Sequence, residues 1–217
     1  VGDLETWQRA EKALADACHE AGLEYELQPG EGAFYGPKLE FKLYDCIGRE
    51  WQCGTIQADF QLPSAERLDA TYIGKDNQKH HPVMLHRAIL GSFERFLGIL
   101  IENFAGAFPT WLAFEQVAVV PVSTEFDDYA KKVNDLLVSH DIRSNVYLGD
   151  ENMKAKIKNI STEHRTPYIL VVGQNEKDSE TVTCRYRFSS KKPQETLKLD
   201  DFVKYVEDKI NTHFVGI

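Results

Sequence analysis

The sequence has 217 residues, 42% of them apolar, which is enough to bury the cores of two ordinary domains. The formal net charge of −9 argues against generic electrostatic binding to nucleic acid, so any RNA contact must be local. No run reaches the roughly 18 to 20 apolar residues of a membrane span, so we expect no membrane partner and a cytoplasmic location. Four cysteines without disulfide or metal-ligand spacing indicate reduced thiols.

In the first half, a helix, several antiparallel strands and a second helix are predicted in that order. Apolar residues recur at helical spacing at the start, and Gly22 can end that helix in a left-handed conformation. Alternating apolar and polar residues on both sides of the turn at 45–48 indicate a hairpin. The expected elements are a helix at 3–21, strands at 39–43, 50–61, 68–73 and 82–85, and a helix from Arg87 to Phe104.

In the second half, strands and helices alternate, which predicts a separate mixed α/β domain. The helical pattern stops near Gly106, and Pro109 blocks further helix, so we expect domains at 1–112 and 113–217. The second domain is nearly neutral, with 17 acidic and 15 basic residues, and is the better place for an RNA contact. The expected elements are strands at 117–122, 142–147, 168–173 and 181–187, and helices at 126–140, 153–164 and 200–211.

The second hairpin strand has an unusually polar face. A period of two places Trp51, Cys53, Thr55, Gln57 and Asp59 on this face and turns Gln52 to the other. For an arbitrary antiparallel strand, a solvent-exposed sheet face is the more frequent explanation. A neighbouring loop favours a binding site instead, because its glycines permit close backbone approach while it offers a hydroxyl and a cation. That loop is the segment at 32–38, with Tyr35 and Lys38.

The helix expected from Arg87 carries two contrasting faces. An apolar stripe is predicted to face the core, and small residues surround Arg95 on the opposite side. Arg95 suits phosphate binding or base stacking, although a surface ion pair explains it equally well. His86 precedes the helix, and spacing alone provides no second metal ligand for it.

Four strings of residues resemble threonyl-tRNA synthetases, in the same order and at similar spacing. They are Gly30-Glu-Gly-Ala-Phe-Tyr-Gly-Pro-Lys38, Trp51-Gln-Cys-Gly-Thr-Ile-Gln57, His86-Arg-Ala-Ile-Leu-Gly-Ser-Phe-Glu-Arg95 and Gly106-Ala-Phe-Pro-Thr-Trp-Leu112. The resemblance covers the whole chain. It implies an α+β fold, with the C-terminal part of a class II antiparallel sheet and its motif 3 helix, followed by a mixed-sheet α/β anticodon-binding domain.

By this resemblance, the first half contributes to a site that activates L-threonine with ATP and Mg²⁺. Arg95 and Lys38 would be catalytic, and His86 would be one ligand of a catalytic Zn²⁺. Selectivity would follow because valine lacks the hydroxyl that zinc takes from threonine. The residues implied to bind threonine or ATP are Tyr35, Gln52, Cys53, Thr55, Gln57, Ser92 and Arg95.

The second half would bind the anticodon of tRNA(Thr) through Glu176 and Arg185, and the family's basic Lys-Ile-Arg element corresponds here to Lys156-Ile157-Lys158. The sequence suggests Lys156 as a phosphate contact. The family's motif 1, motif 2 arginine and other zinc ligands precede this segment in the family's order. We therefore expect a part of a longer, homodimeric threonine–tRNA ligase that is inactive alone. The alternative is a non-catalytic tRNA-binding or regulatory paralogue.

Overall fold

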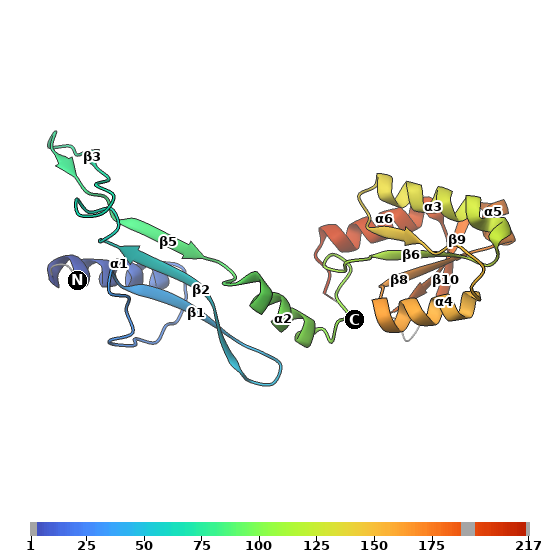
Figure 1. Cartoon of the computed structure of the whole chain (residues 1–217), viewed down its shortest axis with the longest axis horizontal. Coiled ribbons are helices and arrows are strands. Elements are labelled where there is room, and N and C mark those ends of the chain that lie inside the picture. Colours follow the sequence, from blue (N-terminus) through green and yellow to red (C-terminus); the bar gives the residue numbers. More distant parts are fainter. Residues whose placement is uncertain (1–3, 188–193, 216–217) are drawn as a thin grey trace. The chain divides into compact units, whose positions relative to one another are not determined.

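The computed structural model describes residues 4–187 and 194–215. It contains two compact units, residues 1–100 and 101–217 (Figure 1). The division expected from the sequence, between 112 and 113, stays a prediction. Among the described residues, no helix is long and apolar enough to cross a bilayer.

The first unit combines one long helix with a three-stranded antiparallel sheet of order β1-β2-β5. The helix and the hairpin expected from the sequence are confirmed. Strand 68–73 is reduced to its last two residues, which form a small separate hairpin. The elements up to the division, which falls within α2, are α1 Leu4–Glu20, β1 Lys38–Tyr44, β2 Glu50–Asp59, β3 Tyr72–Ile73, β4 Lys79–His80, β5 Met84–Ala88 and α2 Phe93–Asn103.

A β-bulge interrupts the pairing of β1 with β2. Phe41 lies opposite Gly54, but the next residue, Lys42, lies opposite Gln52, so Cys53 is the extra residue of β2. A bulge reverses the alternation of side chains beyond it. The single polar face predicted for β2 is therefore wrong at its start, where Trp51 lies opposite Leu43.

Helix α2 begins later than the sequence predicts. Residues 84–88 continue the sheet as β5, and Gly91 turns the chain at a φ of +71°. The Ser92 hydroxyl then accepts from the Arg95 amide at 3.2 Å, which caps the helix start. The small residues predicted to surround Arg95 on one helix face are Ala88, Gly91 and Ser92. That prediction is wrong, because of these four residues only Arg95 lies in the helix.

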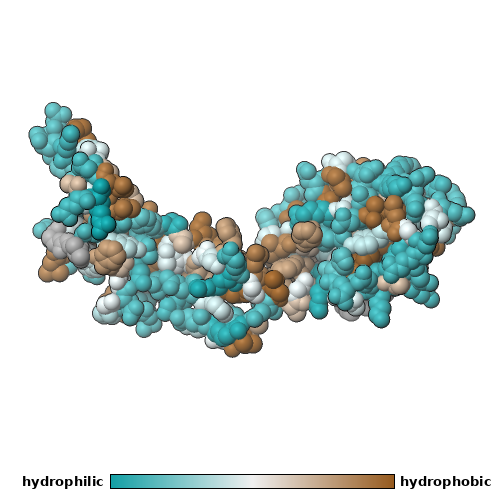
Figure 2. Space-filling model, in the orientation of Figure 1, coloured by the Kyte–Doolittle hydropathy of each residue, from teal (hydrophilic) through white to brown (hydrophobic). Residues whose placement is uncertain are grey.

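The apolar stripe of α2 lies at the surface, whereas the sequence predicted that it would face a core. None of the helix's residues is buried, and Phe93, Leu97 and Ile101 are 72%, 52% and 51% exposed. A helix stripe becomes core only where another element covers it, and no described element of the first unit buries this one. Figure 2 shows apolar side chains at the molecular surface.

The second unit is built on a five-stranded mixed sheet of order β10-β9-β8-β6-β7. β6 is parallel to both β7 and β8, and β9 is antiparallel to its neighbours. The predicted alternation of strands and helices is confirmed, while α5 and β10, both short and polar, were not predicted. The elements are β6 Val117–Pro121, η1 Thr124–Phe126, α3 Asp127–Ser139, β7 Ser144–Val146, α4 Met153–Asn159, η2 Ile160–His164, β8 Tyr168–Val172, α5 Gln174–Ser179, β9 Thr181–Tyr186, β10 Gln194–Lys198 and α6 Leu199–Asn211.

Helices cover both faces of this sheet. On one face, alternate residues of β6 and β8 join side chains of α3 and α6 in the main core, which includes Val119, Leu170, Val133 and Phe202. On the other face, a smaller cluster joins Ala118, Val120 and Ile169 to Ile160 after α4. Thr183 and Arg185 of β9 are not buried, which shows that α4 covers only part of its face of the sheet.

Candidate functional site

The three strands of the first unit bring predicted site residues into one row. Lys38 of β1 lies opposite Gln57 of β2, and Gln57 lies opposite His86 of β5. Directly opposed residues of antiparallel strands project to the same face. Thr55, two residues before Gln57, shares this face, opposite Glu40 and Ala88. Residues far apart in the sequence therefore form one polar surface because the sheet is assembled in this register.

Tyr35 is placed over this surface by a close backbone approach. A Cβ at Gly36 would lie 1.8 Å from the Ala58 carbonyl oxygen, so only glycine fits there. Backbone hydrogen bonds from Ala58 to Pro37, at 3.0 Å, and from Phe60 to Tyr35, at 3.1 Å, hold the loop on β2. The Tyr35 hydroxyl then donates to Gln57 Oε1 at 2.9 Å. Gly36 thus allows the loop to lie close enough to β2 for Tyr35 to contact Gln57.

His86 is hydrogen-bonded to Asp59, a residue without an assigned role in the sequence analysis. Its Nε2 lies 2.8 Å from Asp59 Oδ2, and its ring meets the Tyr35 ring edge-on with centroids 6.2 Å apart. The Asp59 side chain is only 6% exposed. Burial opposes ionisation, but hydrogen bonds from the Leu62 amide, His86 and the Gln61 amide outweigh it and lower the pKa of Asp59.

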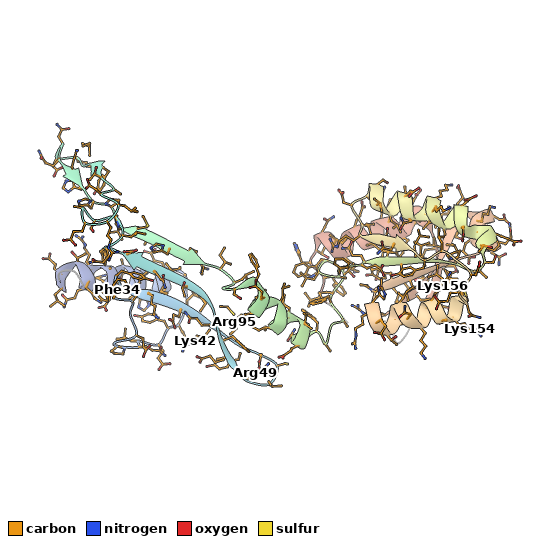
Figure 3. All side chains as sticks on the ribbon, in the orientation of Figure 1. Phe34, Lys42, Arg49, Arg95, Lys154 and Lys156 are labelled. Atoms are coloured by element: carbon orange, nitrogen blue, oxygen red, sulfur yellow. The ribbon has the colours of Figure 1, made fainter. Side chains whose placement is uncertain are left out.

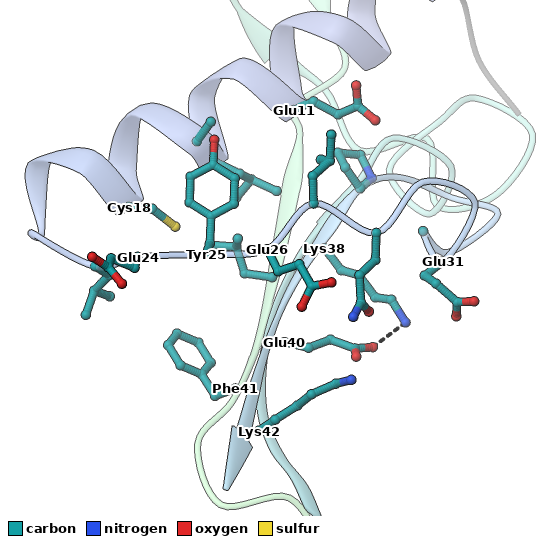
Figure 4. Close-up of a pocket in the computed structure, with 18 of the residues that line it drawn as sticks. Glu11, Cys18, Glu24, Tyr25, Glu26, Glu31, Lys38, Glu40, Phe41 and Lys42 are labelled. Atoms are coloured by element: carbon teal, nitrogen blue, oxygen red, sulfur yellow. Dashed lines mark ion pairs between the residues drawn. The ribbon is translucent and has the colours of Figure 1, made fainter. Parts of the chain in front are cut away.

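Lys38 forms an ion pair with Glu40, two residues along the same face of β1. Both line a cavity of about 680 Å³ between α1, the segment at 23–32 and β1 (Figure 4). Several other carboxylates line the same cavity, so the charge of Lys38 is locally compensated.

The bulge decides where Gln52 and Cys53 lie. Gln52 is exposed and lies opposite Lys42, which alternates with Lys38 and Glu40, so the bulge returns it to the face from which periodicity had turned it. Cys53 is 6% exposed. Its carbonyl oxygen would lie 2.8 Å from a Cβ at Gly91, which shows how closely the turn before α2 approaches β2.

Arg95 lies apart from the row. It is exposed on α2, and its guanidinium carbon lies 5.9 Å from the centre of the Trp51 ring, near the opposite end of β2 from Gln57 (Figure 3). Ser92 is engaged in the helix cap and donates to Glu94 Oε2 at 3.0 Å. The described contacts therefore join Tyr35, Gln57 and His86 but do not join Arg95 to them.

In the second unit, Glu176 contacts the face of β9 on which Arg185 lies. Glu176 accepts from the Thr183 hydroxyl at 2.8 Å and from the Gly173 amide at 3.0 Å, and the second bond caps the start of α5. Arg185 is exposed two residues after Thr183 and so shares its face. This face of β9 offers one carboxylate and one guanidinium group beside a row of threonines.

A second cavity, of about 430 Å³, lies at the end of β6 and was missed by sequence reasoning. β6 has parallel neighbours on both sides, and the carboxyl end of such a strand is where open α/β sheets bind ligands. Polar residues directly after a buried strand were the available signal. The polar and charged residues that line it are Ser123, Thr124, Asp150, Glu151, Asn152, Lys154 and Lys156.

Lys156 does not fit the phosphate contact suggested by the sequence. Its residue is only 5% exposed, and its ammonium group donates to the carbonyl oxygens of Tyr147, at 3.0 Å, and Gly149, at 2.7 Å. These bonds fix the chain between β7 and α4. The neighbouring Lys154 and Lys158 are exposed instead (Figure 3 labels Lys154 and Lys156).

His86 is the candidate metal ligand of the first unit. Over residues 4–187 and 194–215, no group of three or more His, Cys, Asp or Glu side chains could hold a metal ion. His86 nevertheless has the carboxylate partner that metal-ligating histidines usually have. These surroundings are compatible with His86 as a single metal ligand.

Comparison with known proteins gives matches to two domain families and to longer relatives. Residues 4–104 match the tRNA synthetase class II core domain (G, H, P, S and T), and residues 116–209 match an anticodon binding domain. Threonine–tRNA ligases of Treponema pallidum (strain Nichols) and of Wolbachia sp. subsp. Drosophila simulans are 51% and 53% identical over 98% and 97% of this chain. The chain spans only 35% and 32% of their lengths.

A solved structure of a threonyl-tRNA synthetase has the same fold. The RNA binding domain of threonyl-tRNA synthetase from Cryptosporidium parvum Iowa II superposes with a TM-score of 0.86 and 36% identity, over 100% of this chain and 52% of that one. The predicted fold class is thereby confirmed. The chain matches a class II core domain followed by an anticodon binding domain, and threonyl-tRNA synthetases align with it along nearly its whole length. It therefore belongs to the threonyl-tRNA synthetase family of class II synthetases.

Proposed function

We propose that the protein to which this chain belongs is a threonine–tRNA ligase, which activates L-threonine with ATP and Mg²⁺ and transfers it to tRNA(Thr). The observation that carries the proposal is the pair of hydrogen bonds on one sheet face, Tyr35 to Gln57 and His86 to Asp59. Tyr35, Gln57 and His86 belong to strings that resemble the family, and the relatives named above are threonine–tRNA ligases. On this proposal the chain is a part that is inactive alone.

Tyr35 and Gln57 would line the threonine pocket. The Tyr35 hydrogen is donated to Gln57, so the tyrosine oxygen can still accept and the Gln57 amide can still donate. A pocket built from such polar groups rejects an isostere that lacks a hydroxyl by factors on the order of 10⁴, because its own groups would be left unpaired. On this proposal the polar pocket would add to the discrimination against valine that zinc would provide.

His86 would contribute one ligand to a catalytic Zn²⁺. Bound zinc would supply a Lewis acid that fixes the amino and hydroxyl groups of threonine. Catalytic zinc usually has three protein ligands, so this chain alone should hold the metal weakly.

Lys38 and Arg95 would stabilise phosphate charge, because preorganised cations act where charge develops in the transition state. Lys38 would exchange Glu40 for the nucleotide, and Arg95 would hold ATP in a bent form. Thr55, Gln52, Cys53 and Ser92 would complete the surroundings of the adenylate. The exposure of Arg95 leaves its guanidinium accessible to a nucleotide.

The second unit would bind the anticodon. Unstacked bases are read by hydrogen bonds to their edges, and Arg185 offers several donors on an uncovered sheet face while Glu176 accepts. The cavity at the end of β6 would receive an adjacent unpaired base, since hydroxyl and amide groups line it. Exposed Lys154 and Lys158 would supply phosphate contacts. Domains at 1–112 and 113–217 and a homodimeric whole protein belong to the same proposal.

Threonine-dependent exchange of pyrophosphate into ATP tests the catalytic part, in a longer protein that contains this chain. Tyr35→Phe should reduce exchange, because the bond to Gln57 is lost. Tyr44→Phe is a matched control, since its hydroxyl bonds Glu50 at 3.1 Å outside the row. Absent exchange combined with tight tRNA binding would favour the non-catalytic paralogue, and exchange by the 217-residue chain alone would refute the expected division of parts.

Filter binding at two salt concentrations tests the anticodon part. Arg185→Ala should weaken binding of tRNA(Thr) by roughly 1 to 3 kcal/mol, as for a good bidentate base contact, and should flatten discrimination against anticodon mutants. Lys158→Ala should weaken all tRNAs alike and reduce the salt dependence. If Arg185→Ala changes neither affinity nor anticodon preference, the anticodon site lies elsewhere.

A further inference from the structure

We infer that Asp59 is a positioning residue that holds His86 in the tautomer with its hydrogen on Nε2, so that Nδ1 is the nitrogen presented to a ligand. The family resemblance assigns Asp59 no role. The inference about the tautomer stands on hydrogen-bond geometry. Its consequence for a metal ion rests on the proposed function.

Asp59 is itself fixed from two sides. It is the last residue of β2, and its Oδ1 accepts from the backbone amides of Gln61, at 2.8 Å, and Leu62, at 2.9 Å. Oδ2 is then directed to His86 Nε2, 2.8 Å away. The Asp59 carboxylate is almost fully buried, so solvent competes little for this bond. The chain turn after β2 thus determines which oxygen meets the histidine.

The chemistry of the two groups then fixes the proton. The ordinary pKa of an aspartic acid side chain is about 4, so at neutral pH the carboxylate only accepts hydrogen bonds. His86 Nε2 must therefore donate. A neutral imidazole carries one N–H, so its lone pair is on Nδ1. A metal ion requires such a lone pair, and a carboxylate on the other nitrogen orients the ring and raises its basicity.

Asp59→Asn provides a sharp test because the backbone amides dictate how an asparagine must sit. Gln61 and Leu62 require an acceptor, so the amide oxygen would face them and the NH₂ group would face His86. The NH₂ group can only donate. His86 Nε2 would become an acceptor, and its hydrogen would move to Nδ1. The substitution should reverse the tautomer with little change in shape.

The measurement is a long-range ¹H–¹⁵N correlation spectrum of the ¹⁵N-labelled 217-residue chain at pH 8, with the His86 signals identified by their loss in His86→Gln. The wild-type chain should show Nε2–H, and Asp59→Asn should show Nδ1–H. His140 is an internal control, because its Nδ1 lies 2.9 Å from Glu207 Oε1 and should keep its own pattern in both chains. Nδ1–H at His86 in the wild-type chain would overturn the inference whether or not the variant folds. An unchanged tautomer in a folded Asp59→Asn chain would also overturn it.

Zinc alone, titrated into the labelled chain, separates this inference from the proposed function. A zinc-induced shift confined to the unprotonated Nδ1 supports both. Binding through Nε2 would contradict the positioning role. If the tautomers behave as expected and zinc shifts no His86 signal even at millimolar concentration, the positioning role is supported and the proposed metal role of His86 is contradicted.

Discussion

Arg143 donates two hydrogen bonds from its guanidinium group to the carbonyl oxygen of Ala113, at 3.1 and 2.9 Å. It donates a third, at 2.9 Å, to the carbonyl oxygen of Trp111. Nearby, the hydroxyl groups of Thr110 and Tyr168 lie 2.9 Å apart in a buried hydrogen bond. The segment from Phe108 to Gln116, which the sequence marks as a boundary, is therefore attached to the second unit by Arg143, which precedes β7, and by Tyr168 of β8.

Limited chymotrypsin digestion should cut before this attached segment. Cleavage needs local opening of the backbone, so we expect cuts at aromatic or leucine residues up to Phe104 and protection of the bonds after Trp111 and Leu112. Mass spectrometry of the C-terminal fragment reads the position. Arg143→Ala should expose the Trp111 and Leu112 bonds, and Arg185→Ala, on an uncovered sheet face, should not. Rapid wild-type cleavage after Trp111 would show that the segment is a free linker.

Lys156 should act on stability. Lys156→Met keeps most of the apolar stem but leaves two carbonyl oxygens without their donor. Hydrogen bonds from charged groups contribute about 1.5 to 3 kcal/mol each, so the free energy of unfolding of the second unit should fall by about 2 kcal/mol or more. Urea unfolding measures this change. Lys154→Met, at an exposed position of the same helix, should stay within about 0.5 kcal/mol; an equal loss in both would contradict a specific role for Lys156.

Two glycines near α2 should respond in opposite directions to alanine. Gly91 has a φ of +71°, and its Cβ would lie 2.8 Å from the Cys53 carbonyl oxygen. Gly91→Ala should therefore destabilise the first unit by more than about 1 kcal/mol. Gly98 lies inside α2 with open space around it, so Gly98→Ala should stabilise by roughly 0.5 to 1 kcal/mol. Thermal unfolding distinguishes them, and a neutral Gly91→Ala would disprove the close approach of the turn to β2.

Asp45 should make the β1–β2 hairpin sensitive to acid. Burial opposes its ionisation, but hydrogen bonds from Trp51, Arg49 and the Ile47 amide outweigh it, so the pKa of Asp45 lies below its ordinary value. A carboxyl with a lowered folded-state pKa contributes stability that is fully present above the unfolded value near 4 and is lost as pH falls through the folded value.

The Asp45→Asn variant should consequently be less stable than wild type at pH 7, and the difference should shrink as pH falls below about 4. Urea midpoints at pH 7, 4 and 2.5 provide the measurement. Asp16→Asn, which affects only an exposed ion pair with Lys12, should change little at any pH. A stability difference for Asp45→Asn that is constant with pH would show that the hairpin does not depend on the charge.

Periodicity and turn residues alone predicted most of the fold. The α1 helix, the β1–β2 hairpin and the alternating order of the second unit follow from local patterns that need no knowledge of distant contacts. The same patterns failed where local and distant effects compete. Helix periodicity predicted that α2 begins at Arg87. Residues 84–88 instead form β5, because pairing with β2 satisfies their backbone groups.

The sequence by itself determined the family resemblance, the fold class and the identity of the polar residues in the four strings. Only the tertiary structure decided their neighbours. The bulge at Cys53 places Gln52 and Trp51 on the faces opposite to those predicted. Lys156, predicted as a surface cation, is buried and bonds the backbone. The turn after β2 orients Asp59 toward His86. The physical reason is that a side chain's type is local, whereas its face, burial and hydrogen-bond partner depend on strand register and on segments far away in the sequence.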